Sequence, residues 1–113
     1  MLPQRYRLQK SWLIKKVNRR GRKFREYCVG LSVLKQKKPV ESKFAFVVPL
    51  SVSKRAVDRN LLKRRASEVF LQRINDVSSG FDIVVRFGRG AADMSHDKLK
   101  KVIIKLLKKA GML

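Results

Sequence analysis

Residues 53–65 read SKRAVDRNLLKRR, and this stretch decides the predicted fold. A plain basic tail would not need the apolar residues that interrupt it, and the apolar spacing predicts a helix over 53–75. The residues on its core side are Leu62, Ala66, Val69 and Phe70. Arg55 and Arg59 point in nearly the same direction from the first turns. Because charged side chains are not buried among apolar ones without a large penalty, we expect the first turns to project past the sheet that buries the later ones.

The neighbouring segments predict three strands and two more helices, from apolar residues at strand or helix spacing. The first predicted element is a short helix within 7–20, which Ser11 could cap and Gly21 closes. The elements that follow are a strand over 24–35, a turn over 36–42, a strand over 43–51, the basic helix, a turn over 78–80, a strand over 81–87, a loop over 88–95 and a helix over 96–110 capped by Ser95. This order, α-β-β-α-β-α, predicts an α/β fold: a small two-layer sandwich with a β-α-β crossover through the basic helix. No repeat or long linker divides residues 1–113, so we expect a single domain.

The charge balance predicts a polyanionic partner. The 113 residues include 29 Lys and Arg against 8 Asp and Glu, a net charge of +21, while the apolar fraction of 44% is that of a folded protein. Nucleic acid is favoured over a membrane surface, because the basic residues are spread over every segment and do not follow one amphipathic helix. The absence of a long apolar stretch or signal core and the single Cys28 favour a cytoplasmic protein.

The stability of the protein does not explain the basic stripe on the predicted helix. Arg55, Arg59 and Lys63 are spaced i, i+4, i+8, with Asn60 and Arg64 beside them. Like charges at this spacing destabilise a helix, and basic residues in its first turns oppose the macrodipole. A phosphate backbone would explain them, since Arg forks bridge phosphate oxygens and Asn can hold a phosphate, ribose or base edge. A solvated face that keeps the protein in solution and a localisation signal are the alternatives.

The residue pattern does not predict a catalytic or metal site in the protein itself. His96 is the only histidine and has no Cys or His at metal-ligand spacing. Asp93 and Asp97 flank a helix start, where negative charge is favourable in any protein. Cys28 is in a predicted strand without a basic partner, so we expect a core residue and not a nucleophile.

Residues 54–65, KRAVDRNLLKRR, resemble the basic helix of the bacterial ribonuclease P protein subunit. That helix typically reads Lys/Arg-Ala-Val-x-Arg-Asn-x-x-Lys-Arg and follows a strand. The segment 7–21, RLQKSWLIKKVNRRG, matches the opening Arg-Leu, the helix with Val and the Gly of the family, and the strand over 81–87 and the closing helix also fit. The resemblance therefore covers almost the whole chain.

The sequence departs from the family pattern at three places. Leu61 stands where the family usually has the second Arg of Arg-Asn-Arg, and Arg65 is the candidate to compensate. The opening helix has Leu13, Ile14 and Asn18 where an Asp-Phe pair and a second aromatic are usual. Pro49 and Leu50 replace a Lys-Lys pair before the basic helix.

The resemblance implies a subunit of a ribonucleoprotein enzyme. In this family a large RNA hydrolyses precursor tRNA at its 5′ end with divalent metal ions such as Mg²⁺, and the protein is not the catalyst and binds no cofactor itself. The protein binds that RNA with its basic helix and holds the 5′ leader in a cleft between sheet and helices. The family fold is an α/β sandwich with an uncommon left-handed β-α-β crossover, which the general rule would not predict.

Carried over by position, the resemblance names two sets of site residues. Those expected to face the catalytic RNA are Lys54, Arg55, Arg59, Asn60, Lys63, Arg64 and Arg65. Those expected to line the leader cleft are Ile14, Tyr27, Phe44 and Phe46. Bases stack on aromatic rings with little sequence preference, which suits variable leaders. The alternative for Phe44 and Phe46 is the core of the sheet, because only one face of a strand can line the cleft.

Two other kinds of nucleic-acid-binding protein share some of these features. A small basic ribosomal or other structured-RNA-binding protein has a similar size, charge and α/β architecture. A DNA-binding helix-turn-helix domain is disfavoured, because a predicted strand and not a short helix precedes residue 53.

Overall fold

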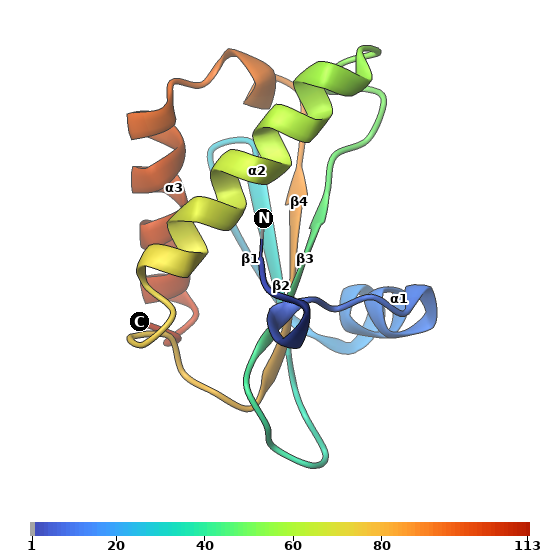
Figure 1. The fold of residues 1–113 in the computed structure, drawn as a ribbon, viewed down its shortest axis with the longest axis vertical. Helices are drawn as coiled ribbons and strands as arrows, with labels where there is room; N and C mark the ends of the chain where they lie inside the picture. Colours follow the sequence, from blue (N-terminus) through green and yellow to red (C-terminus); the bar gives the residue numbers. More distant parts are fainter. Residues whose placement is uncertain (1) are drawn as a thin grey trace.

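The computed structural model describes residues 2–113 and has four strands and three α-helices (Figure 1). In chain order, the elements are a 3₁₀ turn η1 (Gln4–Tyr6), α1 (Ser11–Arg20), β1 (Arg22–Glu26), β2 (Val29–Lys35), β3 (Lys43–Val47), α2 (Ala56–Gln72), β4 (Phe81–Phe87), a 3₁₀ turn η2 (Ala91–Asp93) and α3 (His96–Lys109). The last helix matches its predicted bounds within one residue, and the first helix ends before Gly21 as predicted. Ser11 is the first residue of α1 and not its cap, because Lys10 holds the N-cap position. Ser95 accepts a hydrogen bond from the Lys98 amide at 3.1 Å and so caps α3 as predicted.

The strand predicted over 24–35 is wrong as a single strand, because the structure divides it into β1 and β2. Glu26 pairs with Val29, so Tyr27 and Cys28 form a two-residue hairpin turn. Tyr27 has a φ of 55°, in the left-handed region that a tight hairpin turn requires at its first central position. This turn contains no Gly, Asn, Asp or Pro, so the sequence has no signal there to interrupt the apolar alternation.

The sheet has the order β1-β2-β4-β3. β1, β2 and β4 are antiparallel neighbours, whereas β3 pairs with β4 in parallel. The β3 strand therefore lies at an edge, and it ends at Val47, before Pro49. This placement satisfies the requirement that Pro, which has no amide hydrogen, stays outside the ladder.

The connection from β3 through α2 to β4 is a left-handed crossover. With both strands pointing upward in Figure 1, α2 lies in front of the sheet and β4 lies to the left of β3. About 98% of parallel crossovers have the opposite hand. The structure thus agrees with the unusual crossover that the family resemblance implied.

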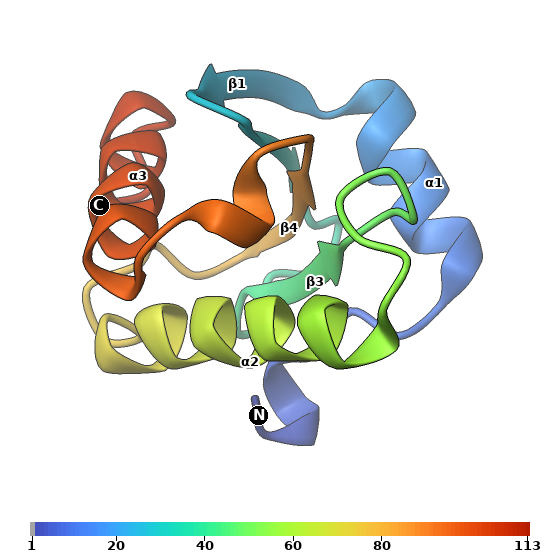
Figure 2. The same ribbon diagram turned by 90° about the horizontal axis from the view of Figure 1, so that it is seen from above.

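Helices cover the two faces of the sheet unequally (Figure 2). The face toward α2 and α3 carries the larger core, which includes Val29, Leu31, Val33, Phe44, Ile83, Val85 and Phe87. On the opposite face, Val17 of α1 packs against Ala45 and Val84 in a smaller cluster. The two-layer sandwich is confirmed for the sheet with α2 and α3, and α1 adds a partial third layer. The rest of the α1 face is left open.

The second half of α2 is anchored in the core, as its phase predicts. Leu62, Ala66, Val69 and Phe70 are all at most 5% exposed. The residues before Leu62 in this helix are not buried. The first turns therefore extend past the region where the sheet buries the helix, and the prediction of an anchored half and a projecting half is confirmed.

Candidate nucleic-acid interface

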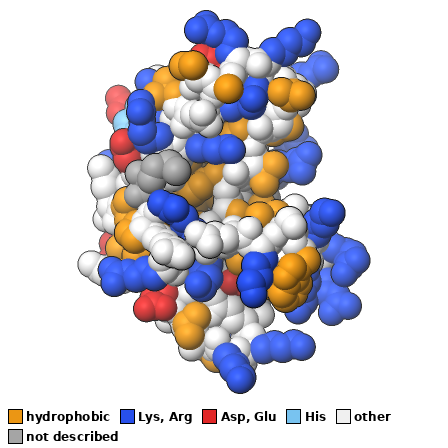
Figure 3. Space-filling model, turned by 45° about the vertical axis from the view of Figure 1, so that its right-hand side comes forward, with side chains coloured by type: hydrophobic (Ala, Val, Ile, Leu, Met, Phe, Trp, Pro, Cys, Tyr) orange, Lys and Arg blue, Asp and Glu red, His pale blue; other side chains and the backbone are white. Residues whose placement is uncertain are grey.

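Basic side chains far outnumber acidic ones on the face of the protein shown in Figure 3. Within residues 2–113, the ion pairs involve only the acidic residues Glu26, Asp58 and Asp76. Most of the 29 Lys and Arg side chains therefore have no acidic partner. Two surfaces bring such residues together: the projecting half of α2 and a groove on the open face of the sheet.

The projecting half of α2 is held in place by the segment that precedes it. The guanidinium of Arg59 donates a hydrogen bond to the carbonyl of Ser53 at 2.9 Å. The hydroxyl of Ser53 donates to Asp58 at 2.9 Å and accepts from the Arg55 amide at 3.2 Å. Asp58 is in the first turn, where its charge is favourable toward the macrodipole. The helix start is thus fixed even though the sheet does not support it.

The seven predicted residues around this half do not share one face. Lys54, Arg55, Asn60 and Arg64 are exposed, and Arg59, Lys63 and Arg65 are half-buried. Arg65 turns toward η2, where it lines a small hollow with Asp58 and Asp93. Basic groups are therefore presented around the helix, and Arg55 is the one that forms an ion pair, with Asp58 at 4.0 Å.

Leu61 lies beside η2, at the position where the family usually has Arg. Its side chain is half-buried and lines the same hollow of about 160 Å³ together with Ala91 and Met94. The segment after β4 thus offers an apolar neighbour at this position.

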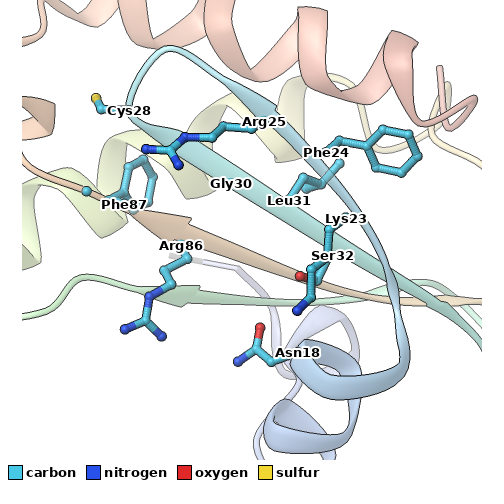
Figure 4. Close-up of a pocket in the computed structure, with 11 residues that line it drawn as sticks. Asn18, Lys23, Phe24, Arg25, Cys28, Gly30, Leu31, Ser32, Arg86 and Phe87 are labelled. Carbon is cyan, nitrogen blue, oxygen red and sulfur yellow. The ribbon is translucent and has the colours of Figure 1, made fainter.

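A groove of about 530 Å³ opens between the end of α1 and the uncovered part of the sheet (Figure 4). Its polar and basic lining residues are Asn18, Lys23, Arg25, Ser32 and Arg86. Gly30 and Gly88 also line it, and its lining contains no acidic residue. Phe24 and Phe87 contribute to its edge, but their rings pack against the core of α2 and α3 on the other face. The groove therefore places basic and polar side chains beside apolar lining surface, without an aromatic ring that belongs to it alone.

The strand register explains how these side chains meet. Arg25 of β1 pairs with Gly30 of β2, which pairs with Arg86 of β4. Lys23 pairs with Ser32 in the next row on the same face. Alternation along each strand sends the intervening residues into the core. The polar positions of this alternation can be seen in the sequence. They can be assigned to one face of the sheet only when the hairpin turn at Tyr27 is recognised.

The residues predicted for the leader cleft do not line this groove. Phe44 is 2% exposed and lies on the α2 face with its ring 4.7 Å from that of Phe70, so its prediction as a cleft residue is wrong and the core alternative holds. Phe46 also faces α2, with its ring 5.5 Å from Phe70. Ile14 is a half-buried residue of α1 that packs against the smaller cluster.

Tyr27 is the one aromatic candidate that remains open to solvent. It is 59% exposed at the hairpin turn, next to Cys28, which lines the groove. The ammonium of Lys98 lies 4.8 Å from the centre of its ring, a cation–π contact. Tyr27 is therefore at one end of the groove and not on its floor.

The other chemically active side chains are isolated. Residues 2–113 contain no group of three or more His, Cys, Asp and Glu that could hold a metal ion. Burial raises the pKa of the Cys28 thiol, the opposite of the shift that activates a nucleophile. The buried Nδ1 of His96 has no hydrogen-bond partner. In the same part of the chain, the helices lack the length and apolar character needed to cross a membrane.

Comparison with known proteins identifies the family of this chain. The family model described as ribonuclease P matches residues 2–111. The ribonuclease P protein component of Pseudanabaena sp. (strain PCC 6903) is 30% identical over 113 residues, which are 100% of this chain and 97% of that protein. The chain therefore belongs to the ribonuclease P protein family.

Solved structures show the same fold. The ribonuclease P protein of Staphylococcus aureus superposes with a TM-score of 0.88 at 21% identity, covering 95% of this chain and 96% of that one. The ribonuclease P protein of Thermotoga maritima gives a TM-score of 0.77 at 23% identity, covering 91% and 94%.

Family membership assigns the chain as the protein subunit of ribonuclease P, which functions in processing the 5′ end of tRNA. The ribosomal and helix-turn-helix alternatives are thereby set aside.

Proposed function

We propose that the projecting half of α2 binds the catalytic RNA of ribonuclease P. The residues assigned to this contact are Lys54, Arg55, Arg59, Asn60, Lys63, Arg64 and Arg65. The support is a helix whose first turns are not buried, are rich in basic groups with Asp58 as their one acidic partner, and are held in place by the Ser53 and Asp58 hydrogen bonds. Arg side chains hold phosphates in forked geometry, and Asn60 adds a group that can contact a ribose or base edge.

The groove between α1 and the sheet receives the 5′ leader of precursor tRNA in this proposal. The observation that carries it is the basic, acid-free lining of a groove about 530 Å³ in volume on an otherwise uncovered sheet face. A single-stranded leader has the width and the charge to enter it. Tyr27 is next to the groove residue Cys28, is 59% exposed, and offers a ring on which a base can stack.

The hydrolysis itself belongs to the RNA subunit and its Mg²⁺ ions in this proposal, and the protein supplies no cofactor. Its positive charge reduces repulsion between catalytic RNA and substrate, so that less Mg²⁺ is required. Residues 1–113 act as a single RNA-binding domain in the cytoplasm, where tRNA precursors are processed.

Reconstitution tests this proposal directly. Purified protein is mixed with a bacterial catalytic RNA and labelled precursor tRNA at low Mg²⁺, and cleavage at the 5′ end is followed. The expected result is strong stimulation by the protein, greater for a substrate with a leader than for one with a single leader nucleotide. No stimulation at any protein concentration would overturn the proposal.

A further inference from the structure

Gly30 lies in the middle of a strand without a structural reason for being glycine. Its backbone is not in the left-handed region, because the glycines with positive φ among residues 2–113 are Gly80, Gly90 and Gly111. A Cβ at Gly30 would meet only the Arg86 carbonyl oxygen at 3.9 Å and the Phe24 carbonyl oxygen at 4.0 Å, which is ordinary contact. Glycine weakens a strand interior and often marks a place where a ligand approaches the backbone closely.

Two arginines flank this glycine on the groove face. Arg25 is its partner on β1 and Arg86 its partner on β4, so the three residues form one row across the sheet. Strands are about 4.8 Å apart, which puts the two arginine backbones about 10 Å from each other with an empty floor between them. Figure 4 shows Gly30 between the two guanidinium side chains.

Neither guanidinium has a partner that would explain its position. Arg25 and Arg86 are exposed, and within residues 2–113 neither forms an ion pair. The groove lining has no acidic residue that could balance them. Two like charges on one face of a sheet repel each other, so their arrangement costs stability unless an anion lies between them.

We propose that Arg25, Gly30 and Arg86 form a saddle that holds one backbone phosphate of single-stranded RNA. The absence of a side chain at Gly30 lets the phosphate sit low in the groove, where the two guanidinium forks reach it from opposite sides. Lys23 and Ser32 in the next row, and Asn18 above them, are polar contacts for the adjoining nucleotide. The groove thus grips the leader by its backbone, and this inference rests on the proposed function of the groove.

The direct test is binding of a fluorescent oligouridylate to the whole protein, measured by anisotropy over a range of salt concentrations. The Arg25→Gln/Arg86→Gln double variant is expected to bind at least about ten-fold more weakly, as expected for lost charge-assisted hydrogen bonds. The slope of log K against log salt is expected to fall by about 0.7 for one lost phosphate contact.

Gly30→Val keeps both charges but fills the saddle, so it is also expected to bind about ten-fold more weakly, with an undiminished melting temperature. Gly30→Ala, with its smaller side chain, should show a lesser loss of affinity.

Arg22→Gln is the matched control. It removes the same group from the same strand, but the alternation of β1 directs Arg22 to the other face, where it lies over the Phe24 ring at 5.3 Å. Its affinity for the oligouridylate should stay within about two-fold of wild type, since a distant surface charge contributes little. Wild-type affinity in a folded Gly30→Val protein, or no binding by the wild type at low salt, would overturn the saddle.

Cleavage assays separate this inference from the proposed function. If the saddle is right, Gly30→Val lowers stimulation for a substrate with a leader and leaves that for a nearly leaderless substrate unchanged. If the saddle is wrong and the proposed function is right, Gly30→Val protein stimulates cleavage of both substrates as the wild type does. If the proposed function is wrong, the wild-type protein stimulates neither.

Discussion

The rings of Phe44 and Phe70 lie with their centroids 4.7 Å apart, tilted by 43°. This contact joins β3 to the second half of α2 at a point where both side chains are at most 2% exposed. The helix that carries the basic projecting turns is therefore oriented by an apolar contact about three to four turns away from them. The orientation of the basic turns and the packing of the core are therefore linked through one helix.

Replacing Phe70 with Ala should lower the free energy of unfolding by about 3–5 kcal/mol, because the cavity would lie between the sheet and α2. Urea unfolding measures this loss. Val57→Ala on the same helix is the control, since Val57 is 67% exposed and its truncation should change stability by less than about 0.5 kcal/mol. An unchanged melting temperature for Phe70→Ala would show that α2 does not turn its Phe70 side toward the core.

Replacing Arg59 and Arg64 with Ala should weaken binding to the catalytic RNA. Each lost phosphate contact is expected to reduce the dependence of log K on log salt by about 1. Filter binding over a salt series measures both quantities. Arg73→Ala at the far end of α2 is the control and should retain the wild-type slope. Equal slopes for all three proteins would remove the projecting half of α2 from the RNA interface.

Replacing Leu61 with Ala should destabilise the protein by about 1–2 kcal/mol, less than for a fully buried leucine, because Leu61 is half-buried against η2. Affinity for the catalytic RNA should change little in the same variant. Chemical denaturation and filter binding test the two statements. A large loss of RNA affinity without a change in stability would mean that Leu61 contacts RNA and does not pack against η2.

Replacing Gly21 with Ala should destabilise the protein by about 1–3 kcal/mol through overpacking. A Cβ there would lie 2.5 Å from the Val17 carbonyl oxygen and 2.9 Å from that of Val33, both rigid backbone atoms. Gly30→Ala is the matched comparison and should be neutral or stabilising, because its site has room. Thermal unfolding distinguishes the two, and equal melting temperatures would contradict this account of how α1 meets the sheet.

Acid should selectively weaken the contact between the β1–β2 hairpin and α3. The hydrogen bond from Lys109 at 2.6 Å, and then that from Lys105, lower the pKa of Glu26 below its ordinary value of 4.5. A lowered folded-state pKa means that the stabilisation is present above pH 4.5 and is lost as pH falls through the folded-state value. Glu26→Gln should remove this part of the pH dependence of stability. If the free energy of unfolding falls in the same way at acid pH in both proteins, the two lysines do not bind the Glu26 carboxylate in solution.

The helices were the most predictable part of this protein, because their signals are local. The spacing of Leu62, Ala66 and Phe70 indicates which side of α2 is buried, and Ser95 marks the start of α3. The sequence did not predict the hairpin, because Tyr27 and Cys28 are not residues typical of turns. Without the hairpin, the side of the sheet on which each β1 residue lies could not be assigned. Phe44 was misplaced for a related reason: alternation separates two faces but does not say which one is covered.

By itself, the sequence determined a basic α/β RNA-binding protein of the ribonuclease P family with an anchored and a projecting half of α2. These features depend on composition, helical period and a contiguous motif, all of which are readable within a few turns of chain. Only the tertiary structure decided that Arg25, Gly30 and Arg86 form one row on the open face of the sheet. Their alignment depends on the register between strands about 55 residues apart in sequence, and register is set by packing of the whole sheet against its helices.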